Sequence, residues 1–408
     1  MTFGTVFSVT GVSYLLLSLF LVAIAGYLLG RVRVKGVSLG AAGVFITALL
    51  FGAFFYPSLA GQLTGEAGSY AGSALKIVEN VGLVLFVLSV GGIAGPSFFS
   101  SLRQNYKSYL LLGVLIILSA TLSCVLCIVA FGCDPSMAVG ILSGALTSTP
   151  GFSAAKETVS AIYQDPARAQ AAEDMVTVGH GIAYLFGVVS KVLFVQLVPR
   201  LTHADMAEER KKLIVVKSGR ARAEKDDLWH MDAVGCGAMA LAAMCGIMLG
   251  GIKIPMGHSA FSLGTTGGAL IASLVLAHFG RIGRLDVSVP ASTAGVFREL
   301  GLMLFLIGAG IPGGAKFVDY FKGVYFLYGV IMTIIPMFVG YYFAKKVLKL
   351  SMLNNLGSIC GGMTSTPALG TLIETAGTAD VASSYAATYP VALVCIVLFS
   401  QFTLLLFA

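Results

Sequence analysis

The sequence predicts an all-α polytopic membrane protein built from two inverted repeats. Its 408 residues are 57% hydrophobic and only 11% charged, far below the roughly 25% charged fraction of soluble domains. Apolar stretches of about 20 residues recur along the chain, and each is long enough to cross a hydrocarbon core of roughly 30 Å. Because a helix satisfies its own backbone hydrogen bonds in lipid, these stretches favour a helical bundle over a barrel.

The charge pattern also indicates a membrane protein rather than one that binds nucleic acid. The formal net charge is +7, but the basic residues lie in short clusters beside the apolar stretches, as the positive-inside rule describes. Cys124 and Cys127 form a CxxC pair, and no second pair or nearby histidine completes a zinc site. We therefore expect no metal, no other cofactor and no nucleic-acid partner.

A polar stretch divides the chain into two halves with six apolar segments each. Between Arg200 and Asp227 the sequence holds eight Lys or Arg and six Asp or Glu, which predicts a solvated loop. The predicted domains are a membrane repeat at 1–199, a linker at 200–228 and a second membrane repeat at 229–408. The apolar segments fall at about 12–30, 38–60, 77–99, 108–131, 136–152 and 175–199, and then at about 231–252, 258–279, 294–314, 322–344, 352–372 and 385–408.

The two halves resemble each other in the order of their motifs. The stretch "LGRVRVKGVSLGAAG" at 29–43 is echoed by "LGGIKIPMGHSAFSLGTTG" at 249–267, and "NVGLVLFVLSVG" at 80–91 is echoed by "ELGLMLFLIGAG" at 299–310. Internal similarity of this kind is the sequence signature of repeated structural units.

The basic clusters predict how the repeats lie in the membrane. If all of them face the cytoplasm, the 200–228 loop is cytoplasmic, both termini lie outside, and each half crosses five times. One segment per half must then enter and leave on the same side, and we assign this to the segment that carries Thr-Ser-Thr-Pro. Five crossings give the halves opposite orientations, as in many secondary transporters. Besides the linker, the clusters are Arg31, Arg33 and Lys35, then Arg103 and Lys107, then Arg281 and Arg284, and finally Lys345, Lys346 and Lys349.

A hydroxyl-rich motif that ends in proline occurs once in each half, in "GALTSTPGFSAAKE" at 144–157 and "GGMTSTPALGTLIE" at 361–374. Proline stops the preceding helix and is favoured at the first position of a new one. We therefore expect Thr149 to cap a helix that restarts at Pro150, and the equivalent pair to do the same in the second half. Each restarted helix offers unpaired N–H donors and a partial charge of about +0.5, which attract anions.

The two motifs, with the residue that follows each proline, are the predicted binding residues. Serine and threonine hydroxyls can replace water around a carboxylate or an amine. One such motif alone is more typical of helix packing, in which hydroxyls bond back to their own helix. Two copies at matching positions favour a transport site instead. The predicted substrate-binding residues are Thr147, Ser148, Thr149, Pro150 and Gly151, and Thr364, Ser365, Thr366, Pro367 and Ala368.

Ionisable residues inside apolar segments are costly, so they are further candidates for substrate or ion coupling. Glu157 and Glu374 each lie seven residues after the motif proline. They either reach a water interface or hold a coupling ion or proton. His180 shares one face of its predicted helix with Lys191, and its near-neutral pKa would suit a proton-linked role.

A second group of ionisable candidates begins a pair of matching helices. Arg298 and Glu299 are in register with Glu79 and Asn80. Their positions allow a local ion pair or an interface location. Alternatively, Arg298 pairs with a substrate carboxylate while Asn80 and Glu299 contact the polar remainder of the substrate.

These motifs resemble those of the bacterial aspartate:alanine exchanger family. The similarity rests on "GALTSTP" and "GGMTSTP", on "VGLVLFVLSVG" and "LGLMLFLIGAG", and on "KGVSLGAAG", and it covers nearly the whole chain. The resemblance implies an inner-membrane carrier that moves small carboxylates or amino acids without a cofactor, such as aspartate exchanged for alanine, or succinate in efflux. Many members carry a cytosolic regulatory domain between the halves, and the short linker implies a member without it.

The predicted function is a secondary transporter of a small anionic or zwitterionic metabolite, by exchange in an alternating-access cycle around the two motifs. By analogy with such folds, we expect the domain that carries the two Thr-Ser-Thr-Pro hairpins to move like an elevator against a homodimeric scaffold. An ion- or proton-coupled symporter or exporter stays open, and a channel would usually need several like filter loops around one axis. An enzyme is not expected, because no HExxH or GxSxG motif occurs.

Overall fold

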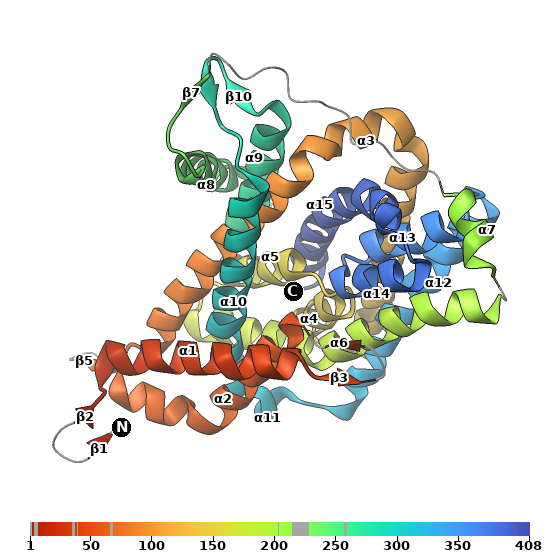
Figure 1. The fold of residues 1–408 in the computed structure, drawn as a ribbon. Coiled ribbons are helices and arrows are strands. Elements are labelled where there is room, and N and C mark those ends of the chain that lie inside the picture. Colours follow the sequence, from red (N-terminus) through yellow and green to blue (C-terminus); the bar gives the residue numbers. More distant parts are fainter. Residues whose placement is uncertain are drawn as a thin grey trace. The chain divides into compact units, whose positions relative to one another are not determined.

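The computed structural model confirms an all-α polytopic membrane protein. Eight helical stretches within the described residues are long and apolar enough to cross a membrane, and Figure 1 shows the helices that contain them. Lys35 of the first basic cluster and residues 214–227 of the linker lie outside the described residues. The described residues are 2–3, 7–34, 37–38, 40–65, 68–202, 204–213, 228–256 and 259–408. The eight spans are Gly11–Gly30, Gly43–Gln62, Ala71–Ile93, Ser108–Phe131, Pro166–Leu201, Ala291–Ala315, Gly323–Lys346 and Ala382–Phe407.

The helices follow a common order in the two halves, although the inverted orientation of the halves stays a prediction. The first half contains α1 (Gly11–Gly30), α2 (Ala41–Gln62), α3 (Ala71–Phe131), α4 (Pro135–Ala145), α5 (Thr149–Ile162) and α6 (Pro166–Leu201). A short helix, α7 (Met206–Lys211), lies in the linker. The second half contains α8 (Cys236–Gly250), α9 (Gly264–Phe279), α10 (Ala291–Ala315), α11 (Phe317–Tyr320), α12 (Gly323–Lys346), α13 (Met352–Gly362), α14 (Thr366–Ala376) and α15 (Ala382–Phe407).

Short strands and one 3-10 turn connect the helices. Most strands form two-stranded antiparallel hairpins, and β11 pairs both with β10 and, in parallel, with β7. The strands are β1 (Thr2–Phe3), β2 (Phe7–Ser8), β3 (Arg33–Val34), β4 (Val37–Ser38), β5 (Thr64–Gly65), β6 (Gly68–Ser69), β7 (Trp229–His230), β8 (Lys253–Met256), β9 (Ser259–Ser262), β10 (Arg281–Ile282) and β11 (Leu285–Asp286), and the 3-10 turn is η1 (Ala379–Val381).

Helix α3 is longer than the sequence predicts. The apolar segments predicted at 77–99 and 108–131 are both present, but one helix of 61 residues joins them. Pro96 lies inside this helix. The stretch "SFFSSLRQNYKS" that follows contains no further proline and no glycine, so it lacks the residues that usually end a helix.

Two compact units divide the chain differently from the sequence repeat. One unit comprises Met1–Phe86 and Glu299–Lys322, and the other comprises Val87–Arg298 and Gly323–Ala408. Each unit therefore takes residues from both halves, and both Thr-Ser-Thr-Pro motifs belong to the second unit. The domain boundaries predicted around the linker describe the repeat and stay a prediction.

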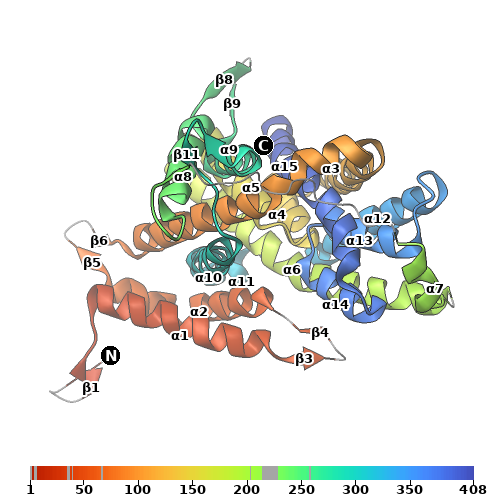
Figure 2. The ribbon, with the colours of Figure 1, turned by 45° about the horizontal axis from the view of Figure 1, so that its top comes forward.

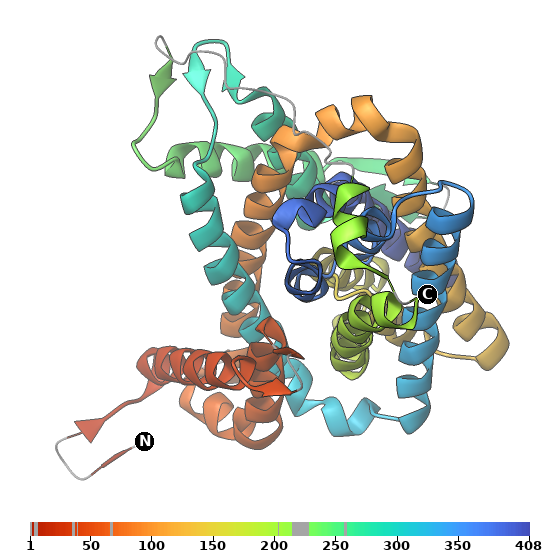
Figure 3. The same ribbon diagram turned by 45° about the vertical axis from the view of Figure 1, so that its right-hand side comes forward.

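The first helix pair of each half packs through the same glycine contact. Helices α1 and α2 lie side by side near the N-terminus (Figure 3). A side chain on Gly30, at the end of α1, would collide with the carbonyl oxygen of Gly40, just before α2. A side chain on Gly250, at the end of α8, would collide in the same way with the carbonyl oxygen of Gly264. Residues without a Cβ allow backbones to approach this closely. The sequence echo between the halves therefore corresponds to a repeated local structure.

Asp232 organises the start of α8. Its carboxylate accepts hydrogen bonds from the backbone N–H groups of Val234, Gly235, Cys236 and Gly237, with N···O distances between 2.5 and 3.0 Å. These bonds favour the charged carboxylate, and the one from Gly237 contributes most. They hold the pKa of Asp232 below its ordinary value of 3.8.

The depressed pKa makes this cap sensitive to pH. A carboxylate whose pKa is lowered in the folded state stabilises the protein above its unfolded pKa, and the stabilisation is lost as the pH falls through the folded value. We expect Asp232→Ala to lower the thermal midpoint at neutral pH, and the difference from the wild-type protein to shrink below about pH 4. Thermal unfolding of both proteins in detergent across this range measures it, and a constant difference would contradict the prediction.

Candidate functional site

The first motif is a helix end followed directly by a new helix. Only residues 146–148 separate α4 from α5, and Thr147 has a φ of 55°. The Ser148 N–H donates to the Ser143 carbonyl at 2.8 Å, and the Thr147 N–H donates to the Gly144 carbonyl at 2.9 Å. These are the two hydrogen bonds of a Schellman motif, which usually places glycine at the left-handed position.

The second motif repeats this geometry between α13 and α14. Thr364 has a φ of 51°. The Ser365 N–H donates to the Cys360 carbonyl at 2.8 Å, and the Thr364 N–H donates to the Gly361 carbonyl at 3.0 Å. Left-handed geometry costs a residue with a side chain about 1–2 kcal/mol, and β-branched residues rarely adopt it. No propensity in the sequence predicts a left-handed threonine, so this feature was not foreseen.

Each new helix begins one residue earlier than predicted. Ser148 and Ser365 occupy the N-cap positions in extended geometry, and Thr149 and Thr366 are the first helical residues. The prediction that Thr149 and Thr366 are the caps was therefore wrong by one residue. The reason is that the left-handed threonine already ends the preceding helix, which leaves the serine to start the next one. The Ser148 hydroxyl accepts a hydrogen bond from the Gly151 N–H at 3.2 Å.

The two motifs are in direct contact. Thr364 Oγ1 donates to the Leu146 carbonyl at 2.9 Å. Lys191 of α6 is only 2% exposed, and its Nζ donates to Thr147 Oγ1 at 3.0 Å and to the Ala145 carbonyl at 3.1 Å. No carboxylate among the described residues forms an ion pair with Lys191. Lys191 thus donates to the last carbonyl of α4 and to the turn that follows this helix.

His180, a predicted coupling residue, is completely buried beside the first motif. Its Nδ1 lies 2.8 Å from Ser143 Oγ, and its ring stacks on Phe152 of α5 with 4.2 Å between the ring centroids. A side chain on Gly144 would collide with the His180 carbonyl. His180 of α6 therefore contacts both helices that flank the first motif, α4 before it and α5 after it. A proton-linked role for His180 stays a prediction.

Glu157 and Glu374 match in the sequence but occupy different environments. The Glu157 carboxylate accepts hydrogen bonds from Thr266 Oγ1 at 3.1 Å and from the Thr266 N–H at 3.3 Å. Thr266 lies in the first turn of α9, where the positive end of the helix dipole suits a carboxylate. Glu374 is exposed on α14. Glu157 therefore stabilises the start of α9, and ion coupling by either residue stays a prediction.

The second motif is open on one side, whereas the first is not. Thr366 is exposed and its Oγ1 lies 3.3 Å from the Tyr385 hydroxyl, but Thr149 is only 6% exposed. The Tyr385 ring stacks on Tyr389 with a centroid distance of 4.9 Å. Arg298 lies close enough to both tyrosines to act on them electrostatically. The predicted Arg298 thus belongs to a polar group that reaches the second motif.

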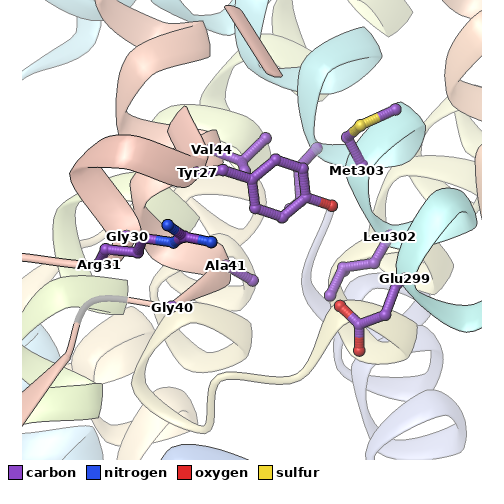
Figure 4. A pocket seen from close by; sticks show the side chains of 10 residues that line it. Tyr27, Gly30, Arg31, Gly40, Ala41, Val44, Glu299, Leu302 and Met303 are labelled. Atoms are coloured by element: carbon purple, nitrogen blue, oxygen red, sulfur yellow. The ribbon is translucent and has the colours of Figure 1, made fainter. Parts of the chain in front are cut away.

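Glu299 and Asn80 belong to the other compact unit. Glu299 lines a cavity of about 270 Å³ together with Tyr27 of α1 and Arg31, which follows that helix (Figure 4). Asn80 is exposed on α3. Figure 4 shows Tyr27 and Arg31 at the end of α1 on one side of this cavity and Glu299 of α10 on the other. The predicted contacts of Asn80 and Glu299 with a substrate stay a prediction.

The linker helix α7 binds both outer ends of the second hairpin, α13–α14. Glu209 accepts a hydrogen bond from the Met352 N–H at 3.2 Å, at the start of α13, and Arg210 donates to the Ala376 carbonyl at 3.2 Å, at the end of α14 (Figure 2). Each charge thus faces a helix end of opposite polarity. Lys212 Nζ lies 2.8 Å from Glu209, and this hydrogen bond raises the pKa of Lys212. The predicted solvated loop is therefore helical at 206–211.

The membrane helices and the two broken-helix motifs together define a polytopic membrane permease. The family described as Predicted Permease Membrane Region matches residues 18–200 and 238–405 of this chain. The chain belongs to this family, and the resemblance of its motifs to the aspartate:alanine exchangers is confirmed.

Curated relatives match over almost their whole length. The chain is 26% identical to an uncharacterized transporter of Bacteroides fragilis and to another of Bacteroides thetaiotaomicron, with 94% of this chain and 97% of each relative covered. It is 25% identical to an uncharacterized transporter of Desulfotalea psychrophila, with coverage of 94% and 95%. These alignments extend over 542 or 543 residues, more than the 408 residues of this chain. The relatives therefore contain segments that this chain lacks.

Proposed function

We propose that this protein is a secondary transporter that exchanges small carboxylates or amino acids, such as aspartate, alanine or a C4-dicarboxylate, across the bacterial inner membrane. The observation that carries this proposal is the contact between the two motifs. Thr364 Oγ1 bonds to the Leu146 carbonyl, so two helix starts and their hydroxyls meet within one compact unit. Broken helices at corresponding positions of two repeats are typical of transporter binding sites.

The charges around the motifs favour a ligand that carries a carboxylate. The starts of α5 and α14 each contribute a partial charge of about +0.5, and Lys191 adds a hydrogen-bond donor 3.0 Å from Thr147 Oγ1. Two carboxylates of α5 and α6 already have partners, because Glu157 bonds to the start of α9 and Glu173 lies 3.7 Å from Lys156. In a low-dielectric surrounding, a bound anion gains from positive groups that no nearby carboxylate neutralises.

The transport cycle follows from the paired motifs. Alternating access requires the site to open in turn to each side of the membrane, and two inverted repeats provide two such states of similar energy. In this proposal the linker is cytoplasmic, both termini lie outside, and the hairpin domain moves like an elevator against a homodimeric scaffold. The chain binds the bilayer and its substrate and needs no cofactor.

Uptake into proteoliposomes tests the proposal. The purified protein is reconstituted, and uptake of labelled L-aspartate and labelled succinate is measured with and without the unlabelled compound inside. We expect saturable uptake that internal substrate accelerates. Uptake that rises linearly with concentration and ignores internal substrate would indicate a channel and overturn the proposal.

The same vesicles separate exchange from ion-coupled symport. Ionophores that collapse proton and sodium gradients stop uptake by a symporter, whereas exchange against internal substrate continues. A thermal-shift screen of dicarboxylates, amino acids and 2-oxoacids identifies compounds that bind the folded state, since such binding raises the thermal midpoint by mass action.

A further inference from the structure

We propose that the two motifs have different roles, and that the substrate carboxylate binds at the start of α14, on the Ser365 hydroxyl and the adjacent backbone N–H groups. The start of α5 is closed by its own serine and holds the site together. This inference rests on the proposed function and refines it, because the sequence alone treats both motifs as equal binding elements.

The two serines occupy the same backbone position but have different partners. Ser148 has φ −99° and ψ 99°, and its hydroxyl accepts from the Gly151 N–H at 3.2 Å. Ser365 has φ −102° and ψ 94° and is completely buried. Among the residues that the structure describes, none forms a hydrogen bond with the Ser365 hydroxyl. A buried hydroxyl without a partner is costly, and a bound carboxylate would satisfy it.

The start of α14 also keeps the backbone N–H donors that a side-chain cap would otherwise occupy. Pro367 has no N–H, so the backbone donors of the first turn are those of Thr366 and Ala368. Serine side chains at N-caps usually accept from the third helical N–H, and Ser365 forms no such bond. The helix therefore presents backbone donors, a hydroxyl donor and the positive end of its dipole at one point, which is the arrangement that binds a carboxylate.

Access distinguishes the two helix starts as well. Thr149 is 6% exposed, and Pro150 and Gly151 are buried among neighbouring helices. Thr366 is exposed, and its hydroxyl contacts Tyr385 at 3.3 Å. The start of α14 is therefore open at Thr366, directly beside the buried Ser365, whereas the start of α5 is covered by protein.

Arg298 is a positively charged side chain close to the two tyrosines beside the second motif. Arg298 acts electrostatically on Tyr385 and Tyr389, whose rings are stacked, and Tyr385 contacts Thr366. A dicarboxylate held by one carboxylate at Ser365 would thus have its second carboxylate on the side of Arg298. This places the two ends of the substrate on different elements, α14 and α10.

Three serine variants of the full chain test the inference. Ser365→Ala removes the orphaned hydroxyl at the start of α14, and Ser148→Ala removes the hydroxyl that caps α5. Ser136→Ala is the matched control: Ser136 is 1% exposed and its hydroxyl also has no partner among the described residues, but it lies at the opposite end of α4 from the motif. Binding of succinate and of L-aspartate is measured by ligand-induced thermal shift, and uptake is measured in proteoliposomes.

We expect Ser365→Ala to weaken binding of both ligands roughly tenfold or more, because a hydrogen bond to a charged group is lost, without lowering the thermal midpoint of the unliganded protein. Ser148→Ala should lower that midpoint by about 2 °C or more, through loss of a helix cap, and weaken binding less. Ser136→Ala should change neither quantity.

The outcomes separate the two proposals. Equal loss of binding in Ser365→Ala and Ser148→Ala would overturn the asymmetry, and so would wild-type affinity in Ser365→Ala. Absence of any stabilisation of the wild-type protein by either carboxylate would also overturn it. Binding that depends on Ser365 in a protein that shows no saturable, trans-stimulated uptake would instead overturn the proposed transport function and leave the binding site standing.

Discussion

Replacing Lys191 with methionine is expected to reduce exchange in proteoliposomes at least about tenfold while the protein still folds. Lys191 Nζ holds Thr147 Oγ1 at 3.0 Å and the Ala145 carbonyl at 3.1 Å. Loss of these buried hydrogen bonds leaves their acceptors unsatisfied, which costs roughly 1–3 kcal/mol, and about 1.4 kcal/mol corresponds to a tenfold change. We expect folding to survive because methionine fills a similar volume and because the cost of burying the lysine amino group is removed with it.

The strained turn explains why this loss should appear in transport. Thr147 adopts a left-handed conformation that its β-branched side chain disfavours, and the Lys191 contact helps to keep it there. Lys346→Met is the matched control, since Lys346 is exposed at the end of α12. A rate for Lys191→Met within twofold of wild type, with Lys346→Met unchanged, would contradict a role for this lysine.

Replacing Gly144 with alanine is expected to destabilise the protein by about 2 kcal/mol or more, the range measured when cores are overpacked. A Cβ at this position would collide with the backbone carbonyl of His180, and a backbone atom cannot rotate away as a side chain could. Both α4 and α6 would have to shift, and with them the first motif. The thermal midpoint and the yield of monodisperse protein in detergent measure the effect.

The same substitution elsewhere in a helix provides the control. A Cβ on Gly92 of α3 would meet no atom within 4 Å, and alanine is a better helix former than glycine by up to about 1 kcal/mol. Gly92→Ala should therefore be neutral or slightly stabilising. If Gly144→Ala unfolded at the same temperature as Gly92→Ala, close packing of α4 against α6 would not limit stability.

Proline, hydrophobic length and repetition made much of this fold predictable. Pro150 and Pro367 mark the helix breaks correctly, because a missing N–H acts locally and needs no tertiary partner. The positions of the eight candidate spans follow in the same way from segment length, whereas the segments predicted at 231–252 and 258–279 form the shorter helices α8 and α9. The run from 94 to 107 was harder to predict, since its polar residues are compatible with either a loop or the helix that it forms.

The details of the site depended on contacts that no local pattern encodes. Thr147 and Thr364 are left-handed against their propensity, so local rules placed the caps one residue too late. Glu157 looks like an intramembrane coupling residue, but its partner Thr266 lies 109 residues away in the sequence. The contact between Thr364 and Leu146 likewise spans 218 residues, and sequence symmetry alone could indicate only that the two motifs are related.

The contacts of α7 connect the two outer ends of the second hairpin, so this hairpin is held at both ends. Its helices are joined at one end by the Thr-Ser-Thr-Pro turn and at the other by the neighbouring pair Glu209 and Arg210. Any displacement of this hairpin must carry the linker helix along or break two hydrogen bonds that each involve a charged side chain. The linker is therefore coupled to the motion of this hairpin, and a force applied to the linker would act on the hairpin through α7.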